Sequence, residues 1–186
     1  NKIGKLGVKD EKRNILASEV LGENGEIIIE EELVMERWLN HFQQLLNPTI
    51  KMQNTNDLHF TNPHFNPPPA EDLNNPISQQ EVFMAIFKAK RGKACGLDNI
   101  PVEVLCDISV QQSLTKLYNV CFETCLVPQE WNVGILHPII KDSSKDNRCP
   151  NNHRGLMLIS HISKIYSGII NNRLSQWCQD NEVLND

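Results

Sequence analysis

The segment between residues 48 and 76 limits most strongly what this chain can fold into. It contains six prolines and six asparagines and offers few aliphatic side chains to bury. Proline fixes its own φ and donates no backbone hydrogen bond, and asparagine favours turns, so we expect a linker here. This linker predicts two domains: a connector arm over residues 1–76, and a folded part over residues 77–186.

The arm contains one strong helical pattern. From Glu31 to Asn47, apolar side chains recur every three or four residues, and acidic side chains stand near the start, where they complement the helix dipole. Before this helix, Asn24 and Gly25 separate two short aliphatic runs, which is the pattern of a small hairpin. We therefore expect a hairpin followed by an amphipathic helix.

Amphipathic stripes also predict helices in the folded part. Ser78 and Glu81 have the spacing of a capping box, and we expect the helix that they begin to end at Gly92. Longer stripes predict helices over about residues 109–125 and 162–179. The three tryptophans, at positions 38, 131 and 177, are expected to anchor the core rather than to stack on bases.

Two short apolar runs, residues 133–140 and 156–160, predict strands separated by a long basic loop. Antiparallel pairing brings Lys141, at the end of the first run, near Arg154, just before the second. A guanidinium fork and an ammonium group on one ribbon suit a polyphosphate, although such cations on a surface hairpin are commonly only solvated. Helices with one main hairpin and no βαβ alternation predict an α+β, mainly helical fold.

The net charge of −5 gives no global electrostatic reason to expect nucleic acid as a partner. Residues 133–173, however, carry six basic side chains against two acidic ones. Six cysteines without a hydrophobic leader favour reduced thiols, so we expect an intracellular protein of the cytoplasm or nucleus. No apolar run approaches the length of about 20 residues that spans a bilayer, so no membrane partner is expected.

The stretch GKACGLDNIPVEVL, residues 92–105, joins basic residues, glycines and a helix-starting proline. Asp98 or Asn99 is expected to cap a helix with Pro101 in its first turn. The glycines permit a tight turn. Lys90, Arg91 and Lys93 surround this turn and are candidates for contacts with a nucleic-acid backbone, the alternative being a solvated helix end.

This stretch resembles the block that opens the reverse transcriptase domain of non-LTR (LINE-type) retrotransposons. Two further runs resemble later blocks of that family in the same order, LYNVCFETCLVPQEWNVGILHPIIK and NNHRGLMLISHISKIYSGIINNRLSQW. Upstream, NGEIIIEEELVMERWLNHFQQLLN is similar to the segment that joins the endonuclease to the polymerase in such elements. The resemblance extends from about residue 21 to residue 177.

The resemblance implies a fingers-like subdomain of a right-handed polymerase, with Lys141 and Arg154 at the positions that contact the triphosphate of the incoming deoxynucleotide. It also implies an RNA template and a DNA primer as partners. Such polymerases hold Mg²⁺ with palm carboxylates, one source of which is a paired-Asp turn. This chain contains no Asp-Asp pair. We therefore expect a truncated fragment of an RNA-directed DNA polymerase, without catalytic residues, metal or cofactor of its own and inactive alone.

Some residues depart from the family pattern. Cys95 stands where the family usually has proline, His153 where it has tyrosine, and Met157 where it has serine. Cys149 and His153 supply too few soft ligands for a zinc site, and loop residues without metal are the simpler interpretation. The rival functions are a non-catalytic helical module that binds RNA or a protein, and a pseudogene product without activity.

Overall fold

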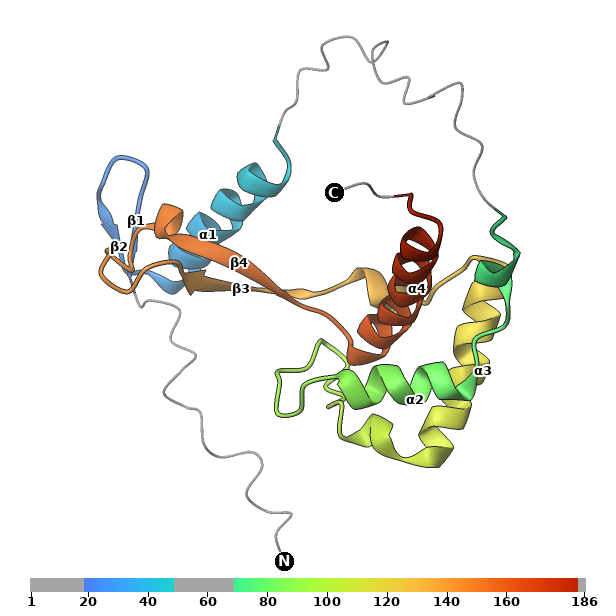
Figure 1. Ribbon diagram of the computed structural model, residues 1–186. Coiled ribbons are helices and arrows are strands. Elements are labelled where there is room, and N and C mark those ends of the chain that lie inside the picture. The colour runs from blue at the N-terminus through green and yellow to red at the C-terminus, as the bar shows by residue number, and fades with distance from the viewer. Residues whose placement is uncertain (1–18, 49–68, 184–186) are drawn as a thin grey trace, which may run out of the picture. The chain divides into compact units, whose positions relative to one another are not determined.

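The computed structural model describes residues 19–48 and 69–183, which contain four α-helices and two two-stranded sheets (Figure 1). The predicted α+β, mainly helical class is confirmed. The described residues form two compact units: 19–48 with 136–156, and 69–135 with 157–183. The predicted division of the chain at residue 76 stays a prediction, and most of the predicted linker lies outside the described residues.

The first unit begins with the predicted hairpin. Strand β1 (Val20–Leu21) pairs antiparallel with β2 (Ile27–Ile28), and Gly25 in the turn between them has a φ of 86°. Glycine reaches this left-handed conformation without steric cost, which explains its place in the turn. Helix α1 (Glu31–Leu46) follows and confirms the helix predicted over nearly the same residues.

A small apolar core holds the first unit together. Helix α1 buries Val34, Trp38 and Phe42, which recur at four-residue steps and so lie on one face of the helix. They pack with the fully buried Val20 of β1, and Leu136 lies against the same cluster. The prediction that Trp38 anchors a core is confirmed.

The second hairpin consists of β3 (Ile135–Ile140) and β4 (His153–Leu158). The backbone N–H of Lys141 donates to the carbonyl of Asn152 at 2.8 Å, so the end of one strand meets the start of the other and the two run antiparallel. The second strand begins earlier than predicted, because the short turn η6 (Pro150–Asn152) ends immediately before it. Arg154 therefore lies within β4 and not before the strand.

The second unit is built from three helices: α2 (Gln79–Lys88), α3 (Ile108–Thr124) and α4 (His161–Asp180). Helix α2 packs against both α3 and α4. Buried side chains of these helices and of the segments beside them form one core: Ile77, Val82, Ile86, Val102, Leu105, Leu114, Tyr118, Ile165 and Ile169. Tyr118 is fully buried, and its hydroxyl donates to the carbonyl of Ile162 at 2.9 Å, which ties α3 to the first turn of α4.

One predicted helix end and one predicted helix in this unit are wrong. Helix α2 ends at Lys88 instead of Gly92, because Ala89 already has an extended backbone with ψ of 134°. The helix predicted to begin at Pro101 is only the 3₁₀ turn η4 (Val104–Cys106). Asp107 then caps α3 by accepting hydrogen bonds from two backbone N–H groups of its first turn, so too few residues remain for a separate α-helix.

Candidate nucleic-acid interface

The loop after α2 makes the predicted tight turn at Gly92. Its φ of 65° lies in the left-handed region, and its N–H donates to Oε1 of Glu103 at 2.7 Å. This hydrogen bond is the largest cause of the lowered pKa of the Glu103 carboxyl. The glycine and the carboxylate together turn the chain back after the last turn of α2.

Gly96 in the same loop serves a different purpose. A Cβ at this position would lie 2.6 Å from the backbone nitrogen of Ser160 and 2.7 Å from the carbonyl carbon of Ile159. Real Cβ atoms do not approach backbone this closely, so only glycine lets the loop lie directly against the residues that precede α4. Ser160 caps that helix by accepting a hydrogen bond from the N–H of Ile162 at 3.1 Å.

Close packing of this loop beside α2 and α4 leaves a cleft of about 390 Å³. It is lined by Ala85, Lys88, Ala89, Lys90, Lys93, His161, Lys164, Ile165, Gly168, Asn171 and Asn172. Four of these side chains are lysines, and none of the described residues that line the cleft is acidic. All four lysines are exposed. The cleft therefore concentrates positive charge on a chain whose net charge is negative.

Of the three predicted nucleic-acid contacts, Lys90 and Lys93 line this cleft and Arg91 does not. Nη2 of Arg91 instead lies 3.7 Å from Sγ of Cys106. Lys88, from the last turn of α2, and Lys164, from the first turns of α4, also line the cleft. Sequence reasoning missed both. Lys88 lies only two residues before Lys90, whereas Lys164 comes near them only because α4 packs against α2.

Helix α4 presents a polar stripe to the cleft. Gly168 lies four residues after Lys164, and Asn171 and Asn172 lie three and four residues after Gly168, which places them on one side of the helix. The stripe is visible in the sequence once α4 is known. The amides add hydrogen-bonding groups beside the lysines, as a sugar and phosphate surface requires.

A second cavity, of about 380 Å³, is lined by residues of three motif blocks. Leu97, Asp98, Ile100, Pro128, Glu130, Trp131, Val133, Ser160 and Ile162 line it. Asp98 does not cap a helix as predicted; its Oδ1 accepts a hydrogen bond from the N–H of Ile100 at 3.2 Å and closes a turn. Trp131 lies half-buried with its ring centroid 5.5 Å from that of Tyr166, and it packs against the core as predicted.

Arg154 points away from α1 in the first unit. Its neighbour His153 packs edge-on against Trp38, with ring centroids 4.8 Å apart, and a Cβ on Gly155 would lie 3.1 Å from the Phe42 ring. Because side chains alternate along a strand, Arg154 belongs to the opposite, exposed face. Among the described residues it forms no ion pair, whereas Arg148 pairs with Asp146 at 2.9 Å.

Lys141 follows the last residue of β3. Leu136 packs towards α1, so alternation assigns Lys141, five positions later, to the same outer face as Arg154. Its Nζ donates to the carbonyl of Asn151 at 2.9 Å, which holds the ammonium group over the loop. Burial, followed by the charges of Arg37, Lys141 and His153, lowers the pKa of His41 on α1, so this imidazole adds no charge near the ribbon at neutral pH.

The described residues do not fit a bound metal. They contain no group of three or more His, Cys, Asp or Glu side chains that could hold an ion. Nδ1 of His153 lies 3.1 Å from the backbone carbonyl of Cys149, so its partner there is that oxygen. In the described part of the chain, no helix has the length and apolarity needed to cross a bilayer.

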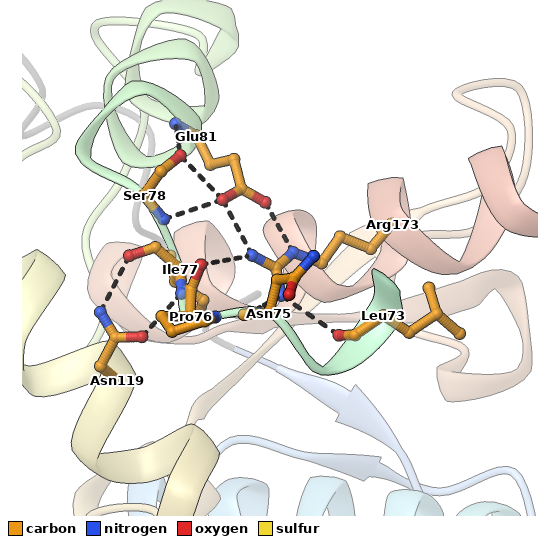
Figure 2. Close-up of polar contacts among 8 residues, drawn as sticks. All are labelled: Leu73, Asn75, Pro76, Ile77, Ser78, Glu81, Asn119 and Arg173. Carbon is orange, nitrogen blue, oxygen red and sulfur yellow. Dashed lines mark hydrogen bonds and ion pairs between the residues drawn. The ribbon is translucent and has the colours of Figure 1, made fainter. Parts of the chain in front are cut away.

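Two residues that match motif positions hold the second unit together instead of contacting a ligand (Figure 2). Arg173 of α4 bonds both carboxylate oxygens of Glu81, at 2.6 and 2.9 Å, and donates to the carbonyls of three residues before α2: Leu73, Asn75 and Pro76. Asn119 of α3 donates to the carbonyl of Ile77 at 2.8 Å and accepts from its N–H at 2.6 Å.

Two known proteins are similar to this chain. A Drosophila melanogaster protein named "Probable RNA-directed DNA polymerase from transposon BS" is 27% identical over 113 residues, 60% of this chain. A Bradysia coprophila protein named "Retrovirus-related Pol polyprotein from type-1 retrotransposable element R1" is 26% identical over 116 residues, 61% of this chain. This chain is similar to retrotransposon reverse transcriptases.

The resemblance predicted from the motif blocks is thereby confirmed. Either match covers only 12% of the relative concerned, so the chain corresponds to a small part of its relatives' length. No protein-family model matches the chain.

Proposed function

We propose that this chain is part of the RNA-directed DNA polymerase of a retrotransposon, and that its basic cleft binds the phosphate backbone of the RNA template. The observation that carries the proposal is the convergence of four lysines on one cleft with no acidic residue among its described lining. The predicted contacts Lys90 and Lys93 belong to it, and Arg91 lies on the same loop. The printed name of one relative, an RNA-directed DNA polymerase, supports the choice of nucleic acid as ligand.

The physical argument is electrostatic. Each lysine that neutralises a phosphate releases condensed counterions, so affinity falls as salt rises. On a single strand, the logarithm of the association constant falls with the logarithm of the salt concentration with a slope of about −0.7 per contact. Four engaged lysines predict a total slope of about −3. Contacts of this kind hold the template in place without reading its sequence, as a polymerase requires.

We further propose that Lys141 and Arg154 bind the triphosphate of the incoming deoxynucleotide, and that the second unit and the β3–β4 hairpin correspond to fingers. The guanidinium of Arg154 is exposed on the outer face of the ribbon and forms no ion pair with the described residues, which supports this role because a guanidinium fork matches phosphate oxygens. The described residues offer no carboxylate cluster for Mg²⁺, so we assign the metal and the DNA primer terminus to the complete polymerase.

The template proposal is tested by fluorescence anisotropy of a labelled oligouridylate with the whole chain. Affinity is measured over salt from about 50 to 200 mM. We expect Lys93→Ala and Lys164→Ala each to weaken binding and to reduce the slope by about 0.7. Lys116→Ala, which removes one exposed charge from α3 outside the cleft, is the matched control. Equal losses in all three variants would refute the cleft as the binding site.

The nucleotide proposal is tested separately with a fluorescent deoxynucleoside triphosphate. Arg154→Ala should weaken its binding by about tenfold, since a charge-assisted hydrogen bond contributes about 1.5 kcal/mol or more. Lys145→Ala, on the loop of the same hairpin, is the control for lost charge. Oligonucleotide binding without any effect of Arg154→Ala on the nucleotide favours the rival function, a non-catalytic RNA-binding module.

A further inference from the structure

His161 differs in kind from the other polar residues of the basic cleft. It is the first residue of α4, lines the cleft and is only 6% exposed. Lys88, Lys90, Lys93 and Lys164 carry ammonium groups, which can only donate hydrogen bonds. A phosphate backbone uses donors alone, so electrostatics does not explain why an imidazole is buried here.

The hydrogen bond of His161 decides which ring nitrogen carries its proton. Nδ1 lies 3.1 Å from the backbone carbonyl of Ile100. A carbonyl oxygen only accepts, so Nδ1 is the donor, and Nε2 of the neutral ring is left as an acceptor. Because His161 lines the cleft and its Nδ1 is engaged by Ile100, Nε2 is the ring nitrogen left for a strand bound there.

We propose that His161 makes the cleft prefer RNA over DNA by accepting a hydrogen bond from a ribose 2′-hydroxyl. This inference rests on the proposed function, because it assumes that the lysines hold a nucleic-acid backbone in the cleft. The 2′-hydroxyl is the donor that distinguishes a ribose from a deoxyribose. The hydrogen bond to Ile100 fixes the ring, so the acceptor is already oriented before the strand binds.

The test compares three oligonucleotides of about 12 uracil nucleotides, a length within single-strand site sizes, that differ only at the 2′ position. One carries hydroxyl, one hydrogen and one fluorine; fluorine keeps the sugar pucker of RNA but removes the donor. Binding is measured at a mildly alkaline pH of about 8, which favours neutral imidazole rings. We expect the ribose strand to bind about fivefold more tightly than either other strand, because one neutral hydrogen bond contributes about that factor to affinity.

Two variants test the roles of the two ring nitrogens of His161 separately. In His161→Asn the side-chain amide lies where Nδ1 was, so it can keep the bond to Ile100 but offers no acceptor at Nε2. This variant should lose the fivefold preference and still bind the deoxyribose strand. His161→Gln places its amide near Nε2 and should retain part of the preference. Far-UV circular dichroism checks that both variants fold, and the fluorinated strand tests the wild type without any variant.

The outcomes distinguish this inference from the proposed function. Equal binding of the three strands by the wild type, with Lys93→Ala weakening all of them, overturns the role of His161 and leaves the template cleft standing. A ribose preference that survives in His161→Asn also overturns it. No binding of any strand, or no effect of the lysine variants, overturns the cleft itself and the role of His161 with it.

Discussion

Replacing Arg173 with methionine removes the most highly connected side chain of the second unit and keeps most of its aliphatic length. The guanidinium makes two hydrogen bonds to Glu81 and three to backbone carbonyls before α2. It also lies 5.5 Å from the ring centroid of Phe122. The side chain is only 14% exposed, so little water competes for these contacts.

The cost of Arg173→Met follows from what it leaves behind. Removing one partner of a buried ion pair costs about 3–5 kcal/mol, chiefly because the other charge stays buried without a partner. The Glu81 side chain is 32% exposed and can be rehydrated, so we expect a smaller loss of about 2–3 kcal/mol. Arg173→Lys keeps the charge without the planar fork and should cost about half as much.

The pH dependence of stability supplies an independent signature. Hydrogen bonds, chiefly from Arg173 and also from Ser78, lower the pKa of Glu81 from 4.5 to about 2. Because the folded-state pKa is depressed, the stabilisation is present above pH 4.5 and is lost as the pH falls towards 2. Such a shift corresponds to at most about 3 kcal/mol, and solvent screening reduces this to about 1–2 kcal/mol. Arg173→Met should remove most of this acid dependence.

Urea unfolding followed by circular dichroism measures the free energy of unfolding at several pH values. Hydrogen exchange then locates the loss, which we expect in residues 69–88 and along α4. Glu81→Gln provides the third corner of a double-mutant cycle. A decrease in the free energy of unfolding below about 0.5 kcal/mol in Arg173→Met, or an unchanged acid dependence, would refute the conclusion that the Arg173–Glu81 contact stabilises the second unit.

The remaining predictions concern two glycines of the second unit. Gly96→Ala should lower the free energy of unfolding by about 1–3 kcal/mol, since its Cβ meets the backbone of Ser160 at 2.6 Å; an unchanged thermal midpoint would contradict this close approach. Gly168→Ala should instead raise the free energy of unfolding by up to about 1 kcal/mol, because no atom lies within 4 Å of its Cβ and alanine favours the helix; destabilisation in the same assay would count against the described helix.

Local patterns predicted the four α-helices and both hairpins of the described residues. The capping box at Ser78 and the apolar stripe of α1 are set by neighbours in sequence, so their geometry can be deduced without the fold. The α-helix expected to begin near Pro101 does not form, and local sequence could not show this. Asp107 is the better cap, and competition between two nearby caps depends on the packing of the residues between them.

The candidate site was only partly predictable. Lys90 and Lys93 are close in sequence and were found together. Lys88 lies beside them in sequence as well, whereas Lys164 joins them only because α2 packs on α4. Arg173 shows the opposite error. The sequence places Arg173 in the basic segment 133–173. In the structure it forms an ion pair with Glu81, so it adds no charge to a nucleic-acid surface.

The sequence by itself determined the mainly helical α+β class, the similarity to retrotransposon polymerases and the candidate cations. The tertiary structure decided which of those cations share a cleft, which is held in an internal ion pair, and which nitrogen of His161 can accept a hydrogen bond. The physical reason is the range of the interactions. Helix periodicity and capping act over three or four residues, whereas the charge of a cleft and the pairing of a cation depend on residues brought together by packing.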